Sequence, residues 1–112
     1  MLFRSLAQGI GQALMENIAF DAESGQMLSA SFMDYAMPRA ADLPLHYEMD
    51  FIDVPAKTNP LGVKGVGEAG CVGAPPVVMN AILDALSVYK ISHLDMPATS
   101  RRVWEAIQKA KA

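Results

Sequence analysis

The sequence predicts an α+β fold in which helices pack on a small, mostly antiparallel sheet and a long glycine-rich loop carries Glu68. Three observations lead to this prediction. Apolar residues recur at helical spacing near both ends of the chain, two central stretches alternate between apolar and polar residues, and about twenty residues after position 54 show no periodicity. At 112 residues the chain has room for one domain, residues 1–112.

Three helices are predicted from the apolar spacing. The first covers residues 3–18 and has one apolar face. The second begins at the proline pair 75–76, because the first turn of a helix tolerates proline, and runs to about Lys90. The third follows Thr99, a suitable N-cap, and would bury Trp104.

Two glycines interrupt the first predicted helix. Gly9 and Gly11 each lower its intrinsic stability by roughly 1 kcal/mol relative to alanine. A helix that keeps two such residues indicates that its backbone lies close to another part of the structure.

The two alternating stretches are predicted to be strands. Residues 27–35 place Met27, Met33 and Tyr35 on one side. Residues 45–54 alternate more regularly, with apolar side chains on one face and His46, Glu48 and Asp50 on the other.

Composition excludes several classes of protein. The net charge is −3, with 9 basic residues, which argues against nucleic acid as a partner. A single cysteine rules out an internal disulfide and is typical of a reducing compartment. The N-terminal stretch has no uninterrupted apolar core of signal-peptide length, and the apolar run after Pro76 looks too short and polar for a bilayer. A cytoplasmic protein with no membrane association is expected.

The stretch "GVKGVGEAGCVGAPP", residues 62–76, contains the spacing G-x-G-x-x-G. A dinucleotide fingerprint requires a strand before it and a helix directly after it, and neither is predicted here. The glycines instead leave Glu68 as the one acidic side chain on a thin backbone. From the residues alone, Glu68 is either a solvated loop carboxylate or a general base whose pKa is raised by burial.

Other ionisable groups have simpler explanations. A solvated strand face accounts for His46, Glu48 and Asp50 better than a metal site, so no metal ligand is predicted. Cys71 lies near Glu68, but no histidine is visibly placed to activate it as a nucleophile.

The stretch "GVKGVGEAGCVGAPPVVMNAILDAL" resembles the C-terminal part of the molybdopterin-binding large subunit of the xanthine dehydrogenase family, the molybdenum hydroxylases. Upstream, "QGIGQALMENIAFDAESGQMLSASFMDYAMPRAADLP" fits the same subunit, as does the closing "DMPATSRRVWEAI". The resemblance extends from Ala7 to Ile107 and is strongest to the carbon monoxide dehydrogenase and aldehyde-oxidising (aldehyde oxidase) branches.

The resemblance implies roles for six residues. Glu68 would be the general base of an oxidoreductase that hydroxylates an aldehyde, an N-heterocycle or a similar carbon, or oxidises carbon monoxide, with water as the oxygen source. Four residues would lie along the molybdopterin, in its cytosine dinucleotide form: Lys64, Gly65, Val66 and Gly67. Gln8 would lie near the same cofactor, although an exposed helical glutamine explains it equally well.

Subunits of that family are several times longer than this chain, which leads to two hypotheses. In the first, the chain is one piece of the enzyme, binds no cofactor and has no activity alone, and needs the remaining part of the molybdenum subunit with iron–sulfur and flavin subunits. In the second, it is a truncated, non-catalytic relic that binds a partner or self-associates as a homo-oligomer through exposed apolar patches. The substrate is left open.

Overall fold

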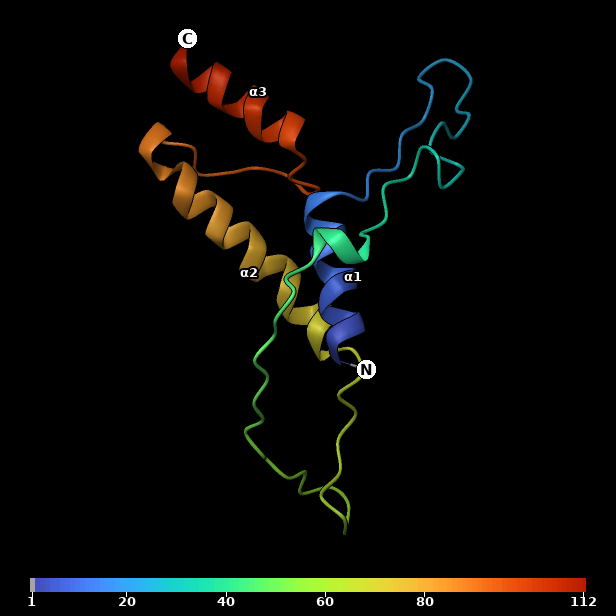
Figure 1. Ribbon diagram of the computed structural model, residues 1–112, viewed down its shortest axis with the longest axis vertical. Coiled ribbons are helices and arrows are strands. Elements are labelled where there is room, and N and C mark those ends of the chain that lie inside the picture. Colours follow the sequence, from blue (N-terminus) through green and yellow to red (C-terminus); the bar gives the residue numbers. More distant parts are fainter. Residues whose placement is uncertain (1) are drawn as a thin grey trace.

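Helices make up the regular structure of residues 2–112, which the computed structural model describes (Figure 1). In chain order the elements are α1 (Leu2–Leu14), the 3-10 helix η1 (Ala40–Asp42), α2 (Ala69–Leu86), the 3-10 helix η2 (Ser87–Tyr89) and α3 (Ser100–Lys111). Within residues 2–112 there is no β-strand, and one isolated antiparallel bridge joins Phe20 to Met27. The predicted α+β fold with a sheet is therefore wrong.

The two predicted strands fail for different reasons. Residues 27–35 contain the isolated bridge and then a turn, in which the Ser31 carbonyl accepts from the Tyr35 N–H at 2.8 Å. Residues 45–54 are extended, but no described segment pairs with them. Alternation shows that two faces have different surroundings, whereas a strand also needs a neighbouring backbone to bond with. Of the apolar face, Tyr47 packs edge-on against Phe3, with ring centroids 4.5 Å apart.

The α1 and α2 helices cross closely along a row of small residues. Ser5, Gly9 and Ala13 are spaced four apart, so they share one side of α1, and all three are buried. A Cβ atom at Gly9 would lie 2.8 Å from Ala74 Cβ and 3.3 Å from Cys71 Cα. The close approach predicted from the glycines is confirmed at Gly9.

Gly11 lies on another side of α1 and is also crowded. A Cβ atom there would lie 2.7 Å from the ring of Pro38 and 2.7 Å from Glu16 Oε1. Both glycines therefore lower the intrinsic stability of α1 but allow close contacts that a larger residue would block.

The α2 helix begins earlier than predicted. It starts at Ala69, so Pro75 and Pro76 lie inside the helix instead of in its first turn. The extra turns pack against α1 around Gly9, which stabilises helical backbone that propensity alone would not. As a result, Glu68 stands immediately before the helix as its N-cap.

The helical stretch Ala69–Tyr89 is long and apolar enough to cross a membrane by length and composition alone. The prediction concerned the run after Pro76 alone, and the helix extends that run backwards to Ala69. The helix packs on α1 around Gly9 and carries Asn80 and Asp84, and 17% of its membrane-length window is buried within the chain.

The α3 helix is tied to the end of α1. The Ala98 N–H donates to the Ala13 carbonyl at 2.6 Å, and the Arg102 guanidinium donates to Asn17 Oδ1 at 3.2 Å. Thr99 caps α3 as predicted, accepting from the Arg102 N–H at 3.3 Å. Trp104 does not anchor the core, since 61% of it is exposed.

The molecule is open. Two long non-helical segments project from the helices in different directions, one between α1 and η1 and one between η1 and α2 (Figure 1). Its accessible surface is 8836 Å², whereas a compact protein of this mass exposes roughly 6,000 Å². Its radius of gyration is 17.9 Å, against roughly 13 Å for a compact chain of this length. The buried apolar residues among those described are few: Ala13, Ala74, Met79, Leu86 and Ala98.

Candidate functional site

The segment before α2 holds most of the predicted site residues. We call residues 64–68 the glutamate loop and residues 45–63 the extended arm. The arm turns back at Asn59, whose side chain bonds both the N–H and the carbonyl of Val63, and at Gly62, which has a φ of 66°. This turn brings the chain back toward the start of α2, so the glutamate loop lies between the arm and the α1–α2 crossing.

Glu68 is an exposed carboxylate at the start of α2. Its backbone is helical, with φ −91° and ψ −10°, and its carbonyl accepts from the Val72 N–H at 3.0 Å. The side chain makes no capping hydrogen bond, and the ion pairs among the described residues do not include it. The carboxylate is therefore available to a group outside this chain.

Ser5 and Cys71 fix the backbone on both sides of Glu68. The Ser5 hydroxyl donates to the Gly67 carbonyl, one residue before Glu68, and Ser5 is 1% exposed. Three residues after Glu68, Cys71 Sγ donates to the Ser5 carbonyl at 3.1 Å. One residue of α1 therefore holds the chain at two points around the glutamate.

The predicted cofactor residues of the glutamate loop are accessible. Lys64, Gly65 and Val66 are exposed, and their backbone N–H groups donate to no described residue. A Cβ atom at Gly65 would meet nothing within 4 Å. A hollow of about 490 Å³ adjoins the loop, lined by Lys64 and Val66 together with apolar residues of the arm such as Phe51.

These features fit a flat, polar cofactor lying along the loop. Unpaired N–H groups are donors for its polar edge, and the absence of side chains at Gly65 lets the backbone approach it. Gly67 contributes less, because its carbonyl is already bonded to Ser5 and it is half-buried.

Gln8 lies on α1 and is exposed. Its Oε1 accepts from Arg4 at 2.8 Å, so the side-chain amide NH₂ is the group left to face a ligand. Nothing in these contacts separates a cofactor ligand from an ordinary surface glutamine.

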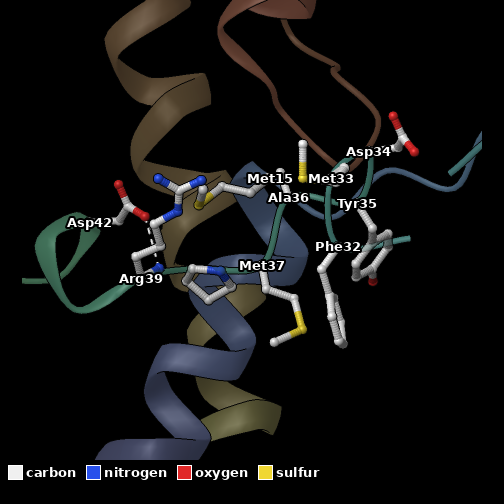
Figure 2. A pocket seen from close by; sticks show the side chains of 10 residues that line it. Met15, Phe32, Met33, Asp34, Tyr35, Ala36, Met37, Arg39 and Asp42 are labelled. Atoms are coloured by element: carbon white, nitrogen blue, oxygen red, sulfur yellow. Dashed lines mark hydrogen bonds between the residues drawn. The ribbon is translucent and has the colours of Figure 1, made fainter. Parts of the chain in front are cut away.

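A second hollow lies away from the glutamate loop, between the end of α1 and residues 32–42, and has a volume of about 400 Å³ (Figure 2). Met15, Met33, Met37 and Phe32 line it, and the Arg39 N–H donates to Asp42 Oδ2 at 2.8 Å across its rim. It contains none of the predicted site residues.

The described residues do not form the metal site or the cysteine nucleophile considered from the sequence. His46 Nε2 lies 3.8 Å from Glu48 Oε1, and both side chains are exposed. Among the described residues, no group of three or more histidine, cysteine, aspartate or glutamate side chains is arranged to hold a metal. Cys71 is half-buried and bonded to Ser5, which makes it a structural thiol.

Residues 5–44 match a molybdopterin cofactor-binding domain. The chain is 38% identical over 104 residues, 93% of its length, to the carbon monoxide dehydrogenase large chain of Hydrogenophaga pseudoflava. It is 39% identical over 101 residues, 90% of its length, to the nicotine 6-hydroxylase large subunit of Paenarthrobacter nicotinovorans. It spans 13% of the first relative and 12% of the second.

The structure matches a solved copper- and molybdenum-containing carbon monoxide dehydrogenase with a TM-score of 0.91 at 34% identity. The match covers 98% of this chain and 14% of that one. The match therefore includes the extended arm and the other projecting segment, which have similar conformations within that much longer chain.

These matches define a segment of a molybdopterin-binding protein. More narrowly, the chain belongs with the C-terminal part of the large subunit of the molybdenum hydroxylases, whose members include molybdenum-binding subunits of xanthine dehydrogenase and aldehyde oxidoreductase. The family resemblance stated from the sequence is confirmed.

Proposed function

We propose that this chain supplies one wall of the active site of a molybdenum hydroxylase and that Glu68 is its general base. The proposal is supported most directly by the position of Glu68: an exposed, unpaired carboxylate on a backbone held at both ends by Ser5. A general base must be accessible to the group whose proton it takes and must be held in place, and the exposure of Glu68 and the two Ser5 contacts support such a role.

In this role, a Glu68 carboxylate oxygen takes the proton of the water-derived hydroxyl that is transferred to the substrate carbon. Loss of that proton makes the oxygen a stronger nucleophile. The molybdenum cofactor, when bound, supplies the two-electron oxidation that the reaction requires. The substrate is an aldehyde, an N-heterocycle or a similar carbon, or carbon monoxide.

The glutamate loop would hold the cofactor, a molybdopterin that we propose to be in its cytosine dinucleotide form. Backbone N–H groups of Lys64, Gly65 and Val66 are the donors for its polar edge, and Gly67 keeps the loop thin beside it. Gln8 would add its side-chain amide from α1. The chain by itself covers too little of such a ligand to hold it, so we expect no cofactor on the isolated protein.

The chain requires partners. Its accessible surface exceeds that of a compact protein of its mass by roughly 3,000 Å², which is more than a standard protein–protein interface buries. We propose that the remaining part of the molybdenum subunit covers this surface and that iron–sulfur and flavin subunits complete the electron path. The assembly is expected in the cytoplasm, without nucleic acid or membrane.

A second candidate function uses the same exposed surface. Side chains such as Leu45 and Ile52 are almost fully exposed, and apolar surface of this kind also drives self-association. In that case the chain is a non-catalytic relic that forms homo-oligomers or binds another protein.

Co-expression with the remaining part of the molybdenum subunit and with iron–sulfur and flavin subunits separates the two functions. The first predicts a complex that contains molybdenum and oxidises an aldehyde with a dye as electron acceptor. In that complex, Glu68→Gln should lower kcat by at least roughly a hundredfold, the lower end of general-base effects, while molybdenum content stays the same.

The matched control is Glu23→Gln, which makes the same change at an exposed turn. It should keep both molybdenum and activity. Full activity in Glu68→Gln would remove Glu68 from the proposed role. A chain that forms only homo-oligomers under co-expression would support the relic.

A further inference from the structure

We propose that Ser5 is a positioning residue for Glu68, and that its hydroxyl fixes the backbone from which the carboxylate side chain extends. This inference rests on the proposed role of Glu68 as the base. It assigns a function to a residue of α1 whose bonded partner, Gly67, lies 62 positions away in the sequence.

The first support is the chemistry of the buried hydroxyl. A hydroxyl taken out of water without a partner destabilises a protein by roughly 1–3 kcal/mol, so an apolar residue would normally occupy a site that is 1% exposed. In Ser5 the hydroxyl instead donates to the Gly67 carbonyl, on a segment that leaves the α1–α2 crossing. An alanine would fill nearly the same space, so the hydroxyl contributes the bond and little else.

The second support is the identity of the accepting group. The Gly67 carbonyl belongs to the planar peptide that joins Gly67 to Glu68. Holding that carbonyl fixes the orientation of the peptide plane, and hence the backbone from which the Glu68 side chain departs. Glycine at position 67 makes this plane free to rotate, so a fixed orientation needs an external contact.

The third support is the second contact of Ser5. Its carbonyl accepts from Cys71 Sγ at 3.1 Å, and the Glu68 carbonyl accepts from the Val72 N–H at 3.0 Å. The backbone is therefore anchored on both sides of Glu68. The Ser5 hydroxyl holds it on the N-terminal side, and the Ser5 carbonyl and the first turn of α2 hold it on the C-terminal side. The side-chain torsions of Glu68 are the freedom that is left, which suits a base that must meet a bound hydroxyl group.

The test compares variants in the complex of this chain with the rest of the enzyme. Ser5→Ala removes the hydroxyl without adding volume, and Ser5→Cys keeps a weaker donor in nearly the same space. The matched control is Ser29→Ala, which removes another buried hydroxyl, one that accepts from the Ala19 N–H at 2.9 Å, far from the loop. Steady-state kinetics are measured together with amide hydrogen exchange of residues 66–71.

Ser5→Ala should lower kcat by roughly tenfold or more, the range expected when a reacting group is misplaced, with KM changed by less than about twofold. Within residues 66–71, exchange of the Ala69 amide, which donates to the Val66 carbonyl at 3.2 Å, should become faster. Ser5→Cys should lie between Ser5→Ala and the unaltered chain in both readouts. Ser29→Ala should change neither, even if it lowers the thermal stability of the complex by a similar amount.

The inference is overturned if Ser5→Ala keeps its kcat and its slow exchange in a complex that Glu68→Gln inactivates. It is also overturned if Ser29→Ala loses as much kcat, because the effect would then be general. Should Glu68→Gln be fully active, the role of Glu68 fails, and the exchange data alone decide whether Ser5 holds the loop.

Discussion

In the crossing of α1 and α2, Gly9 and Ala74 are buried and leave no room for another atom, whereas in the extended arm Ile52 is 93% exposed and Leu45 is fully exposed. Both regions are rich in small or apolar residues. The crossing is packed by contacts within the chain, while most apolar side chains of the arm are exposed and Tyr47 packs against Phe3. One part of this chain therefore packs through its own contacts, whereas the other exposes apolar surface that we propose the remaining part of the molybdenum subunit covers.

The glutamate loop joins these two regions. It is anchored to the crossing at Gly67, and Cys71 of α2 bonds the same residue, Ser5. Its exposed residues Lys64, Gly65 and Val66 continue from the arm. The proposed base, Glu68, therefore follows the part that folds by its own contacts, and the backbone that we propose faces the cofactor adjoins the exposed arm.

The largest expected effect comes from filling the crossing. Gly9→Ala should destabilise the chain by roughly 1–3 kcal/mol, because the new Cβ would lie 2.8 Å from Ala74 Cβ and overpacking outweighs the gain in helix propensity. Gly73→Ala is the matched control inside α2, where a Cβ would meet nothing within 4 Å. It should stabilise by roughly 0.5–1 kcal/mol. Urea unfolding followed by circular dichroism measures both, and equal effects of the two changes would contradict the close crossing.

A charge on the arm should act on assembly and leave the fold intact. Ile52→Asp should weaken binding of the remaining part of the molybdenum subunit by roughly tenfold or more, since a carboxylate would have to be buried there. Helix content and unfolding of the isolated chain should be unchanged. Glu48→Ala, on the same segment and already polar, is the control. Titration by calorimetry gives the affinities, and equal affinities for both variants would mean that the arm is not covered.

The smallest expected effect concerns α3, whose start is encoded locally. Thr99→Ala removes the oxygen that accepts from the Arg102 N–H and should destabilise by about 1 kcal/mol. Thr99→Ser keeps that oxygen and should restore most of the loss. The melting temperature of the chain reports both, and an unchanged value for Thr99→Ala would show that the cap contributes nothing.

Local signals in the sequence were sufficient for part of this fold. Apolar spacing predicted all three α-helices, Thr99 marked the start of α3, and the glycines in α1 predicted a close approach that Gly9 shows. These features depend on residues within one or two turns of each other, or on the absence of a side chain.

Sequence patterns whose outcome depends on residues far away in the chain lead to wrong predictions. The alternation at residues 45–54 predicts a strand that does not form, because period two reports two different faces and says nothing about whether a neighbouring backbone exists. Pro75 predicts the first turn of the second helix, but α2 begins at Ala69, because the turn before the proline packs against Gly9. Of the candidate site, Glu68 was found from the glycines around it, and its role stays a prediction. Ser5 was missed because its bond spans 62 positions, and the four-residue spacing of Ser5, Gly9 and Ala13 was the one available hint.

Amide hydrogen exchange of the 112-residue chain, alone and with the remaining part of the molybdenum subunit, tests the contrast between crossing and arm most directly. Alone, amides of α2 around Ala74 and Met79 should exchange slowly, while those of the arm before its turn, residues 45–54, should exchange at the rate of an unstructured chain. Adding the partner should slow exchange of the arm by roughly tenfold or more and leave the crossing unchanged. An arm that is equally protected in the isolated chain, or that stays unprotected in the complex, would contradict this account.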